Sequence, residues 1–254
     1  MEALETTLTA LLHGESGVGK SWLADTVPGP RLILDLEGRA KYTPSGPKIL
    51  WDVRTQAPPV HDGTWDTCVV MVPDFDTLTQ VFTWLRSGQH PFVSVVVDSL
   101  MEAQKRCIDA RFGAIALDQQ GWGTLLRELE KIVRDYRDLT LVPSTHVRVV
   151  VFVTGSVQDG KNWRPLLQGA LKDTVPYYID VVGYYFLNPM VTAEGATVGF
   201  VRSLLVEKRP GFIAKDGTGK IVVAYPDGIV PEPNITKLVE LLNVYGKPEG
   251  VVAA

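Results

Sequence analysis

One octet near the N-terminus constrains the fold more than any other feature of the chain. Residues 14–21 read GESGVGKS, a complete G-x-x-x-x-G-K-S loop, and the apolar run 8–12 comes directly before it. Glycine permits the backbone turns that aim several N–H groups at a polyphosphate, and a following helix adds its positive end. The run before the loop predicts a strand and residues 21–26 predict a helix, which is the context that this mechanism requires. The octet therefore predicts a nucleotide-binding α/β fold.

Each part of the octet has an expected role in binding ATP. Lys20 is expected to reach the β- and γ-phosphates, and the hydroxyl of Ser21 to ligate Mg²⁺. ATP and Mg²⁺ are therefore the expected ligands. The residues expected to surround the phosphates are Gly14, Glu15, Ser16, Gly17, Val18, Gly19, Lys20 and Ser21.

Charge and hydropathy limit the kinds of partner that the protein is expected to bind. The formal net charge of −4 argues against a protein that coats duplex DNA by bulk electrostatics. No apolar run approaches the roughly 18 residues needed to span a bilayer, and the N-terminus lacks the basic-then-apolar order of a signal peptide. We therefore expect a cytoplasmic protein without a membrane partner. The histidines and cysteines lack metal-ligand spacing, so zinc is not expected, and Cys68 and Cys107 are expected to be reduced core residues.

Short β-branched runs alternate with helical patterns along the chain. This alternation predicts a mostly parallel central sheet flanked by helices, with ligands at the carboxyl ends of the strands. No long linker divides the chain, so we expect one domain over residues 1–245 and a flexible tail over 246–254. The polar, glycine-rich stretch 211–219 predicts a hairpin. Strands are expected at 31–36, 67–72, 93–97, 148–153 and 181–187, and helices at 75–85, 122–136 and 234–243.

Two further acidic positions follow strands. Asp98 ends the apolar run 93–98, where a carboxylate can hold hydrated Mg²⁺ opposite Ser21. Glu37 lies just beyond the run 31–36, where a carboxylate could orient the water that attacks the γ-phosphate. Asp35 competes with Glu37 for this role, because strand alternation places both on the same side of Leu36.

These elements, in this order, resemble the core of RecA-like recombinases. The family's catalytic glutamate falls on Glu37 in the segment LDLEG, and its metal-site strand on VVVDS, residues 95–99. From about Leu8 to Lys220 the chain more closely resembles compact phage-encoded ATPases described as AAA-type or RecA-like single-strand annealing proteins. The resemblance implies a RecA-like P-loop NTPase core, ATP hydrolysis, single-stranded DNA as a partner and the cytoplasm of a bacterial host.

Two segments take the places of the family's DNA-binding loops. Residues 112–123 occupy the place of the first loop, and residues 154–177 that of the second, with the family's glycine-alanine-leucine-lysine run at 169–172. Cations interleaved with an aromatic residue suit phosphate pairing and base stacking on single strands. An ordinary surface loop with one packed tryptophan is the alternative. The DNA-binding candidates are Lys161, Trp163, Arg164 and Lys172.

Lys208 and Arg209 follow a late strand, where the family supplies basic residues to the γ-phosphate of a neighbouring subunit. They are therefore candidate catalytic residues acting in trans, and a homo-oligomer, ring or filament, is expected. Little precedes the first strand, so assembly is expected to use the core itself. Residues 154–156 read Thr-Gly-Ser where the family's nucleotide-sensing glutamine would stand, which makes simple annealing better supported than strand exchange.

The sequence thus favours an ATP- and Mg²⁺-dependent RecA-like ATPase that binds single-stranded DNA and promotes annealing or recombination, with a single-strand-binding protein as a further expected partner. Two alternatives stay open. A P-loop kinase would need a lid with arginines, for which the basic residues 161–164 are the nearest candidates, and an acceptor pocket, which nothing in the sequence marks. A nucleotide-gated interaction module would hydrolyse ATP without responding to DNA.

Overall fold

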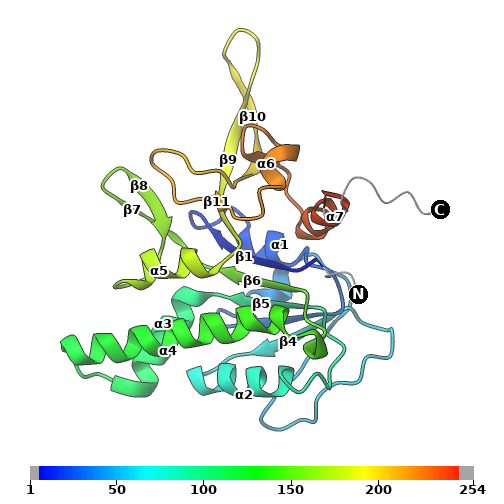
Figure 1. The fold of residues 1–254 in the computed structure, drawn as a ribbon, viewed down its shortest axis with the longest axis vertical. Helices are drawn as coiled ribbons and strands as arrows, with labels where there is room; N and C mark the ends of the chain where they lie inside the picture. The colour runs from blue at the N-terminus through cyan, green and yellow to red at the C-terminus, as the bar shows by residue number, and fades with distance from the viewer. Residues whose placement is uncertain (1–5, 246–254) are drawn as a thin grey trace.

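A twisted, mostly parallel sheet forms the centre of the protein (Figure 1). The computed structural model describes residues 6–245, so the predicted tail at 246–254 lies outside the described residues. The strand order is β12-β10-β9-β1-β6-β5-β2-β4-β3, with β11 pairing to β9. From β9 to β3 every neighbouring pair is parallel, whereas β10, β11 and β12 run antiparallel to their partners. The strands are β1 Leu8–His13, β2 Arg31–Asp35, β3 Lys48–Leu50, β4 Thr67–Met71, β5 Ser94–Asp98, β6 Val149–Val153, β9 Val181–Val191, β10 Thr197–Leu205, β11 Lys215–Asp216 and β12 Ile229–Pro231.

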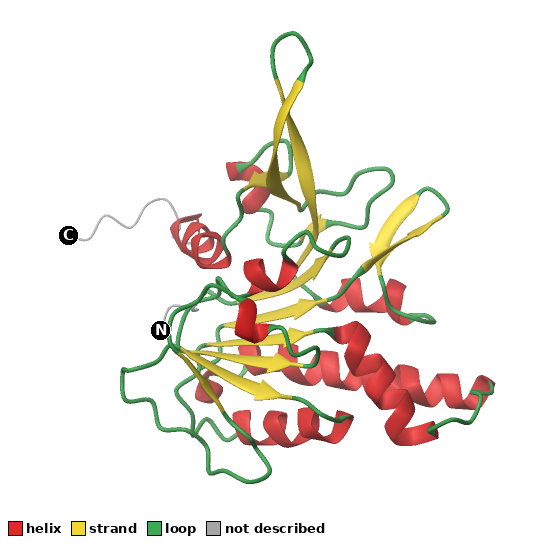
Figure 2. Cartoon of the chain, turned by 180° about the vertical axis from the view of Figure 1, so that it is seen from behind, coloured by secondary structure: helices red, strands yellow, loops and turns green. Residues whose placement is uncertain are grey.

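Helices cover both faces of this sheet (Figure 2). Alternate side chains along each buried strand contribute to two separate apolar layers, as the two-residue period of a strand requires. One layer packs against α2, α3, α4 and α5, and the other against α1, α6 and α7. The helices are α1 Lys20–Ala24, α2 Phe75–Leu85, α3 Leu100–Phe112, α4 Gln119–Asp138, α5 Leu171–Tyr178, α6 Ile221–Ala224 and α7 Ile235–Tyr245, with 3₁₀ turns η1 Ala40–Tyr42, η2 Leu139–Leu141 and η3 Pro143–Thr145.

The architecture confirms the predicted fold class, a P-loop NTPase core with a mostly parallel sheet. Each of the predicted strands and helices is present, with ends shifted by a few residues. Cys68 and Cys107 are buried and free, as expected. None of the helices in the described part of the chain is long and apolar enough to cross a membrane.

The hairpin predicted at 211–219 is wrong. Residues Lys215–Asp216 instead pair with β9, and the carboxylate of Asp216 accepts the N–H groups of Thr218, Ile221 and Val222. The polar glycine-rich pattern thus belongs to a turn that leads into α6. The actual hairpins are a short one, β7 (Ser156–Asp159) with β8 (Asn162–Pro165), and a long one, β9 with β10, that projects from the body (Figure 1).

Candidate functional site

The phosphate loop connects β1 to α1, and its glycines are required by geometry. Gly17 and Gly19 have φ angles of 82° and 101°, in the left-handed region that side chains disfavour. A Cβ atom on Gly14 would come within 2.2 Å of the carbonyl oxygen of Tyr185 on β9. The first glycine therefore lets the loop lie against the neighbouring strand, and the other two let it turn back toward α1.

Lys20 folds back over its own loop. Its Nζ donates to the carbonyl oxygens of Gly14, at 2.9 Å, and Glu15, at 2.7 Å. Burial lowers the pKa of the ammonium group, and the nearby carboxylates of Asp98 and Glu37 oppose that shift. The ammonium group thus lies between the loop and two carboxylates, where a polyphosphate could take over its hydrogen bonds.

Ser21 and Asp98 meet at the carboxyl end of β5, as the sequence predicts. Burial raises the Asp98 pKa to about 6, the nearby hydroxyl of Ser21 opposes the rise, and the charges of Glu37 and Asp35 add to it. Among residues 6–245 no group of three or more His, Cys, Asp and Glu side chains could hold a metal ion. A hydroxyl and one carboxylate, with the remaining positions left to water and phosphate, are the donor set that Mg²⁺ accepts. These residues therefore fit hydrated Mg²⁺ bound together with a nucleotide.

The structure separates Glu37 from Asp35. Asp35 is buried, and its carboxylate accepts the main-chain N–H groups of the four residues that follow Leu36. Its oxygens therefore hold the turn after β2 in shape, and Asp35 does not line the nucleotide pocket. Glu37 lines that pocket. The geometry thus favours Glu37 as the residue that faces a nucleotide.

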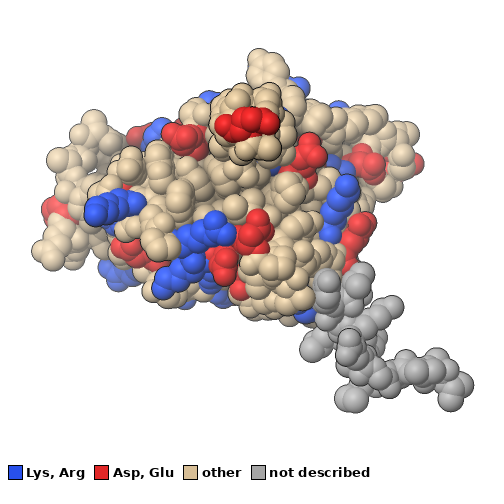
Figure 3. Space-filling view, turned by 90° about the horizontal axis from the view of Figure 1, so that it is seen from above, with Lys and Arg blue, Asp and Glu red and all other residues tan. Residues whose placement is uncertain are grey.

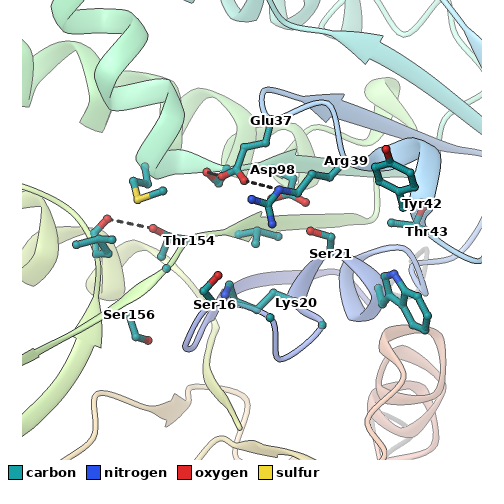
Figure 4. A pocket seen from close by; sticks show the side chains of 18 residues that line it. Ser16, Lys20, Ser21, Glu37, Arg39, Tyr42, Thr43, Asp98, Thr154 and Ser156 are labelled. Atoms are coloured by element: carbon teal, nitrogen blue, oxygen red, sulfur yellow. Dashed lines mark hydrogen bonds and ion pairs between the residues drawn. The ribbon is translucent and has the colours of Figure 1, made fainter.

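Two partners hold the Glu37 carboxylate. The hydroxyl of Ser99 donates to Oε1 at 2.6 Å. Nε of Arg39 lies 3.1 Å from Oε2, and Figure 4 draws this ion pair as a dashed line. Ser99 also caps the first turn of α3 by accepting the N–H of Glu102. Arg39 was not a predicted site residue, although a cation two positions after a candidate acid was a visible signal. The carboxylate is therefore fixed by both a hydroxyl and a guanidinium group.

These groups surround one open pocket of about 400 Å³. Figure 4 shows Lys20 and Ser21 from the start of α1 facing Asp98, Glu37 and Arg39 across it. Five of the predicted loop residues line it, namely Ser16, Gly17, Gly19, Lys20 and Ser21, whereas Gly14, Glu15 and Val18 do not.

Two aromatic side chains at the pocket escaped the sequence analysis. Trp22 on α1 is 52% exposed and Tyr42 in η1 is 69% exposed, and both line the pocket. Large exposed aromatic residues at a polar pocket are suited to contact a planar base. Because twenty residues separate them in the sequence, no local pattern indicated that both line the same pocket.

The opposite wall of the pocket comes from the second predicted DNA segment. Thr154, Gly155 and Ser156 line it, together with Leu166 beyond the β7–β8 hairpin. Buried His13 lies behind this wall: its Nε2 donates to the carbonyl of Ile213 at 2.6 Å, so its Nδ1 accepts the Ser156 hydroxyl at 2.8 Å. The strand that leads into the phosphate loop is therefore tied to both the hairpin and the 213 region.

The four predicted DNA-binding residues differ in their surroundings. Lys161 is exposed at the tip of the β7–β8 hairpin. Arg164 forms ion pairs with Asp159 and Asp173, and Lys172 lies 3.7 Å from Asp159. The half-buried ring of Trp163 packs against Tyr184, with centroids 6.1 Å apart. Two of these cations are therefore already paired with carboxylates, and the tryptophan has a packing role.

Lys208 and Arg209 do not line the nucleotide pocket of their own chain. Lys208 is exposed, and Arg209 donates to the carbonyl of Asp227. A different cation lies beside the phosphate loop: Arg202 on β10 donates to the carbonyl of Val18 at 3.1 Å. Arg202 was missed because 184 positions separate it from Val18.

A comparison with known protein families found a match to the chain. The family described as "AAA domain" matches residues 6–218 of the chain. This match covers both the phosphate loop and the segment that forms the opposite wall of the pocket. A search of curated proteins found no match.

Proposed function

The chain belongs to the AAA domain family, and from that premise we propose that it is an ATP- and Mg²⁺-dependent, RecA-like ATPase that binds single-stranded DNA and promotes annealing or homologous recombination. Family membership supports nucleotide binding and nucleotide-dependent ATPase activity. The proposal has further parts. Single-stranded DNA is the partner, the chain assembles into a homo-oligomer, and residues 1–245 form a single domain. The protein comes from a phage and acts in the cytoplasm of a bacterial host.

The pocket supplies a residue for each requirement of hydrolysis. Lys20 holds phosphate oxygens, and Ser21 with Asp98 would hold Mg²⁺, which neutralises phosphate charge when it is bound. Glu37 accepts a hydrogen bond from water and orients it, while Ser99 and Arg39 keep the carboxylate in position. Catalysis of phosphoryl transfer depends mainly on such positioning and on electrostatic stabilisation.

One observation carries the DNA part of the proposal. Residues 154–156, the start of the second predicted DNA segment, form a wall of the nucleotide pocket. The β7–β8 hairpin that follows carries exposed Lys161 and is fixed to the phosphate-loop strand through His13. A nucleotide that moves this wall would move the hairpin, so ATP and DNA binding would be coupled.

Surface charge favours local rather than extended contact with nucleic acid. In the view of Figure 3, Lys and Arg side chains lie beside Asp and Glu side chains on a largely uncharged surface. The face drawn there lacks the broad positive patch that binds duplex DNA without sequence preference. Recognition of single strands through a few cations and stacking side chains needs no such patch.

Lys208 and Arg209 support assembly. They lie outside the pocket of their own chain, so they could reach a γ-phosphate only in a neighbouring subunit. In an oligomer each site would then be completed by its neighbour, and hydrolysis by the isolated chain would be slow.

A strand-annealing assay tests the proposal. The rate at which two complementary single strands form duplex would be measured with wild-type protein and with Lys20→Ala, with ATP and Mg²⁺ present or absent. We expect wild-type protein with ATP to accelerate annealing and Lys20→Ala to lose most of that acceleration. Annealing at the spontaneous rate under every condition would refute the proposed function and favour the interaction module.

A further inference from the structure

A second cavity, distinct from the nucleotide pocket, lies where α3, the start of α4 and the turn before α5 meet. Its volume is about 170 Å³. Trp122 and Gly123 contribute one wall, residues 168–171 another, and Gln104 of α3 a third. The two segments predicted from the sequence to contact DNA, 112–123 and 154–177, thus come together at this cavity.

Gln104 brings an unused hydrogen-bond donor to the cavity wall. The residue is only 3% exposed. Its Oε1 accepts the main-chain N–H of Gln168 at 3.0 Å, which fixes the carboxamide against a residue that also lines the cavity. Its Nε2 is buried and has no hydrogen-bond partner. Because a buried donor without a partner is unfavourable, this group is suited to a ligand that presents a carbonyl oxygen.

Trp122 gives the cavity an aromatic wall. Its side chain is 39% exposed although α4 directs most of its apolar residues into the core. Leu125 and Leu171 are buried and line the cavity beside it. The volume is close to the ~150 Å³ of a cavity that accommodates benzene. The volume, the apolar lining and the unpartnered donor of Gln104 therefore match one planar heterocycle that carries a carbonyl group.

Two cations neighbour residues that line this cavity. Arg127 donates to the carbonyl of Gly123, a residue that lines the cavity, at 3.1 Å and thus lies about one helical turn beyond it. Lys172 directly follows the lining residue Leu171, and its ammonium group lies 3.7 Å from the carboxylate of Asp159. A ring bound in the cavity would therefore have cations near any phosphate groups attached to it.

We propose that this cavity holds one carbonyl-bearing nucleobase of a single strand, stacked on Trp122 and hydrogen-bonded to Nε2 of Gln104. The inference rests on the proposed function, since it assigns a base site to the same DNA-binding surface. Thymine, cytosine and guanine present a carbonyl oxygen to such a donor, whereas adenine presents only ring nitrogens. The site therefore favours oligothymidine over oligoadenine and requires a base, while Arg127 and Lys172 pair with the backbone.

The test compares binding of three fluorescent single strands of equal length: oligothymidine, oligoadenine and a strand of abasic sugar phosphates. Binding constants would be measured for wild-type protein, Trp122→Ala, Gln104→Glu and the control Leu141→Ala, which truncates an exposed leucine outside the cavity. Gln104→Glu keeps an oxygen for the Gln168 N–H and removes the donor. Ala170→Leu, at an exposed lining position, is a second variant that fills the cavity.

We expect wild-type protein and Leu141→Ala to bind oligothymidine roughly tenfold more tightly than the abasic strand, as the loss of one stacked base implies. Trp122→Ala, Gln104→Glu and Ala170→Leu should lose most of this preference and bind the abasic strand as the wild type does. Equal binding of oligothymidine and the abasic strand by wild-type protein would overturn the base site and leave single-strand binding intact. Absence of binding to all three strands would instead refute the proposed function. A change of oligomeric state in Trp122→Ala without DNA would assign the cavity to a protein contact and overturn the proposal.

Discussion

The Nδ1 atom of His13 lies 2.8 Å from the hydroxyl oxygen of Ser156, so the residue that precedes the phosphate loop is hydrogen-bonded to the first residue of the β7–β8 hairpin. The other ring nitrogen donates to the carbonyl of Ile213. Trp163 of the hairpin is also bonded through its main chain to the segment 211–213. One buried imidazole thus joins the end of the strand before the phosphate loop to the second predicted DNA segment and to the segment that follows Arg209.

Protonation of His13 should destabilise the protein in acid. Burial lowers its pKa from 6.5 to about 4. Between these values the unfolded chain binds a proton that the folded chain does not, so the free energy of unfolding falls as pH drops from 6.5 toward 4. At about 1.4 kcal/mol per pKa unit, the loss is on the order of 3 kcal/mol. Urea unfolding across this range should show a shallower acid loss for His13→Gln than for wild type or His61→Gln. Identical slopes for all three proteins would contradict this role.

Replacing Glu37 by glutamine should separate binding from turnover. The amide keeps the size of the side chain but cannot act as the carboxylate that orients water, so we expect kcat to fall by about 100-fold or more while ATP affinity is kept. Steady-state hydrolysis and equilibrium nucleotide binding measure the two effects. Glu102→Gln, which alters an ion-paired acid of α3 outside the pocket, is the matched control. Retained turnover would direct attention back to Asp35.

Asp35→Asn should act on stability rather than on chemistry. Its buried carboxylate accepts four main-chain N–H groups, and an amide offers one acceptor oxygen in place of two. Hydrogen bonds to a charged group contribute about 1.5–3 kcal/mol each, so we expect a lower unfolding midpoint by thermal denaturation. An unchanged midpoint would show that the turn after β2 does not depend on this carboxylate.

Truncation of Lys208 or Arg209 should leave ATP binding intact and abolish DNA-stimulated hydrolysis. Neither residue lines the pocket of its own chain, so their effect should appear only in the assembled protein. Hydrolysis with and without single-stranded DNA would be compared for Lys208→Ala, Arg209→Ala and Lys105→Ala, the last removing an exposed cation of α3. Normal DNA-stimulated turnover in both Lys208→Ala and Arg209→Ala would show that neither residue acts on the γ-phosphate of a neighbouring subunit.

Tyr42 and Trp22 should contribute to binding the base of the nucleotide. Because an aromatic contact is worth about 0.5–1.5 kcal/mol, Tyr42→Ala and Trp22→Ala should each weaken ATP binding by roughly three- to tenfold. Calorimetry with ATP and with inorganic triphosphate distinguishes a base contact from a phosphate contact. Equal weakening for both ligands would show that the aromatic side chains shape the phosphate loop instead.

Local patterns in the sequence were sufficient to predict the parallel sheet, the phosphate loop and the positions of Asp98 and Glu37. Continuous apolar runs identify strands buried on both faces, and the octet determines its own context. Sequence alternation could not separate Asp35 from Glu37, because the distinction depends on the turn after β2 closing around one carboxylate. The sheet strands, the phosphate loop and the two acids were predictable because their signals lie in short runs of consecutive residues.

Contacts between segments that are far apart in the sequence could not be predicted from local patterns. Arg202 reaches the phosphate loop only because β10 pairs with β9, which in turn lies beside β1. The cavity beside Gln104 requires α3, α4 and the turn before α5 to meet. The length of β9 was underestimated because its outer half, which includes Met190 and Val191, is exposed and lacks the buried pattern used to find strands.

ATP hydrolysis by wild-type and Lys20→Ala proteins, measured alone, with single-stranded DNA and with duplex DNA, tests the central claim most directly. We expect slow hydrolysis by the wild type alone, clear stimulation by single strands, weaker stimulation by duplex, and none of these activities in Lys20→Ala. Wild-type turnover that requires Lys20 but is the same with and without DNA would contradict a DNA-dependent ATPase.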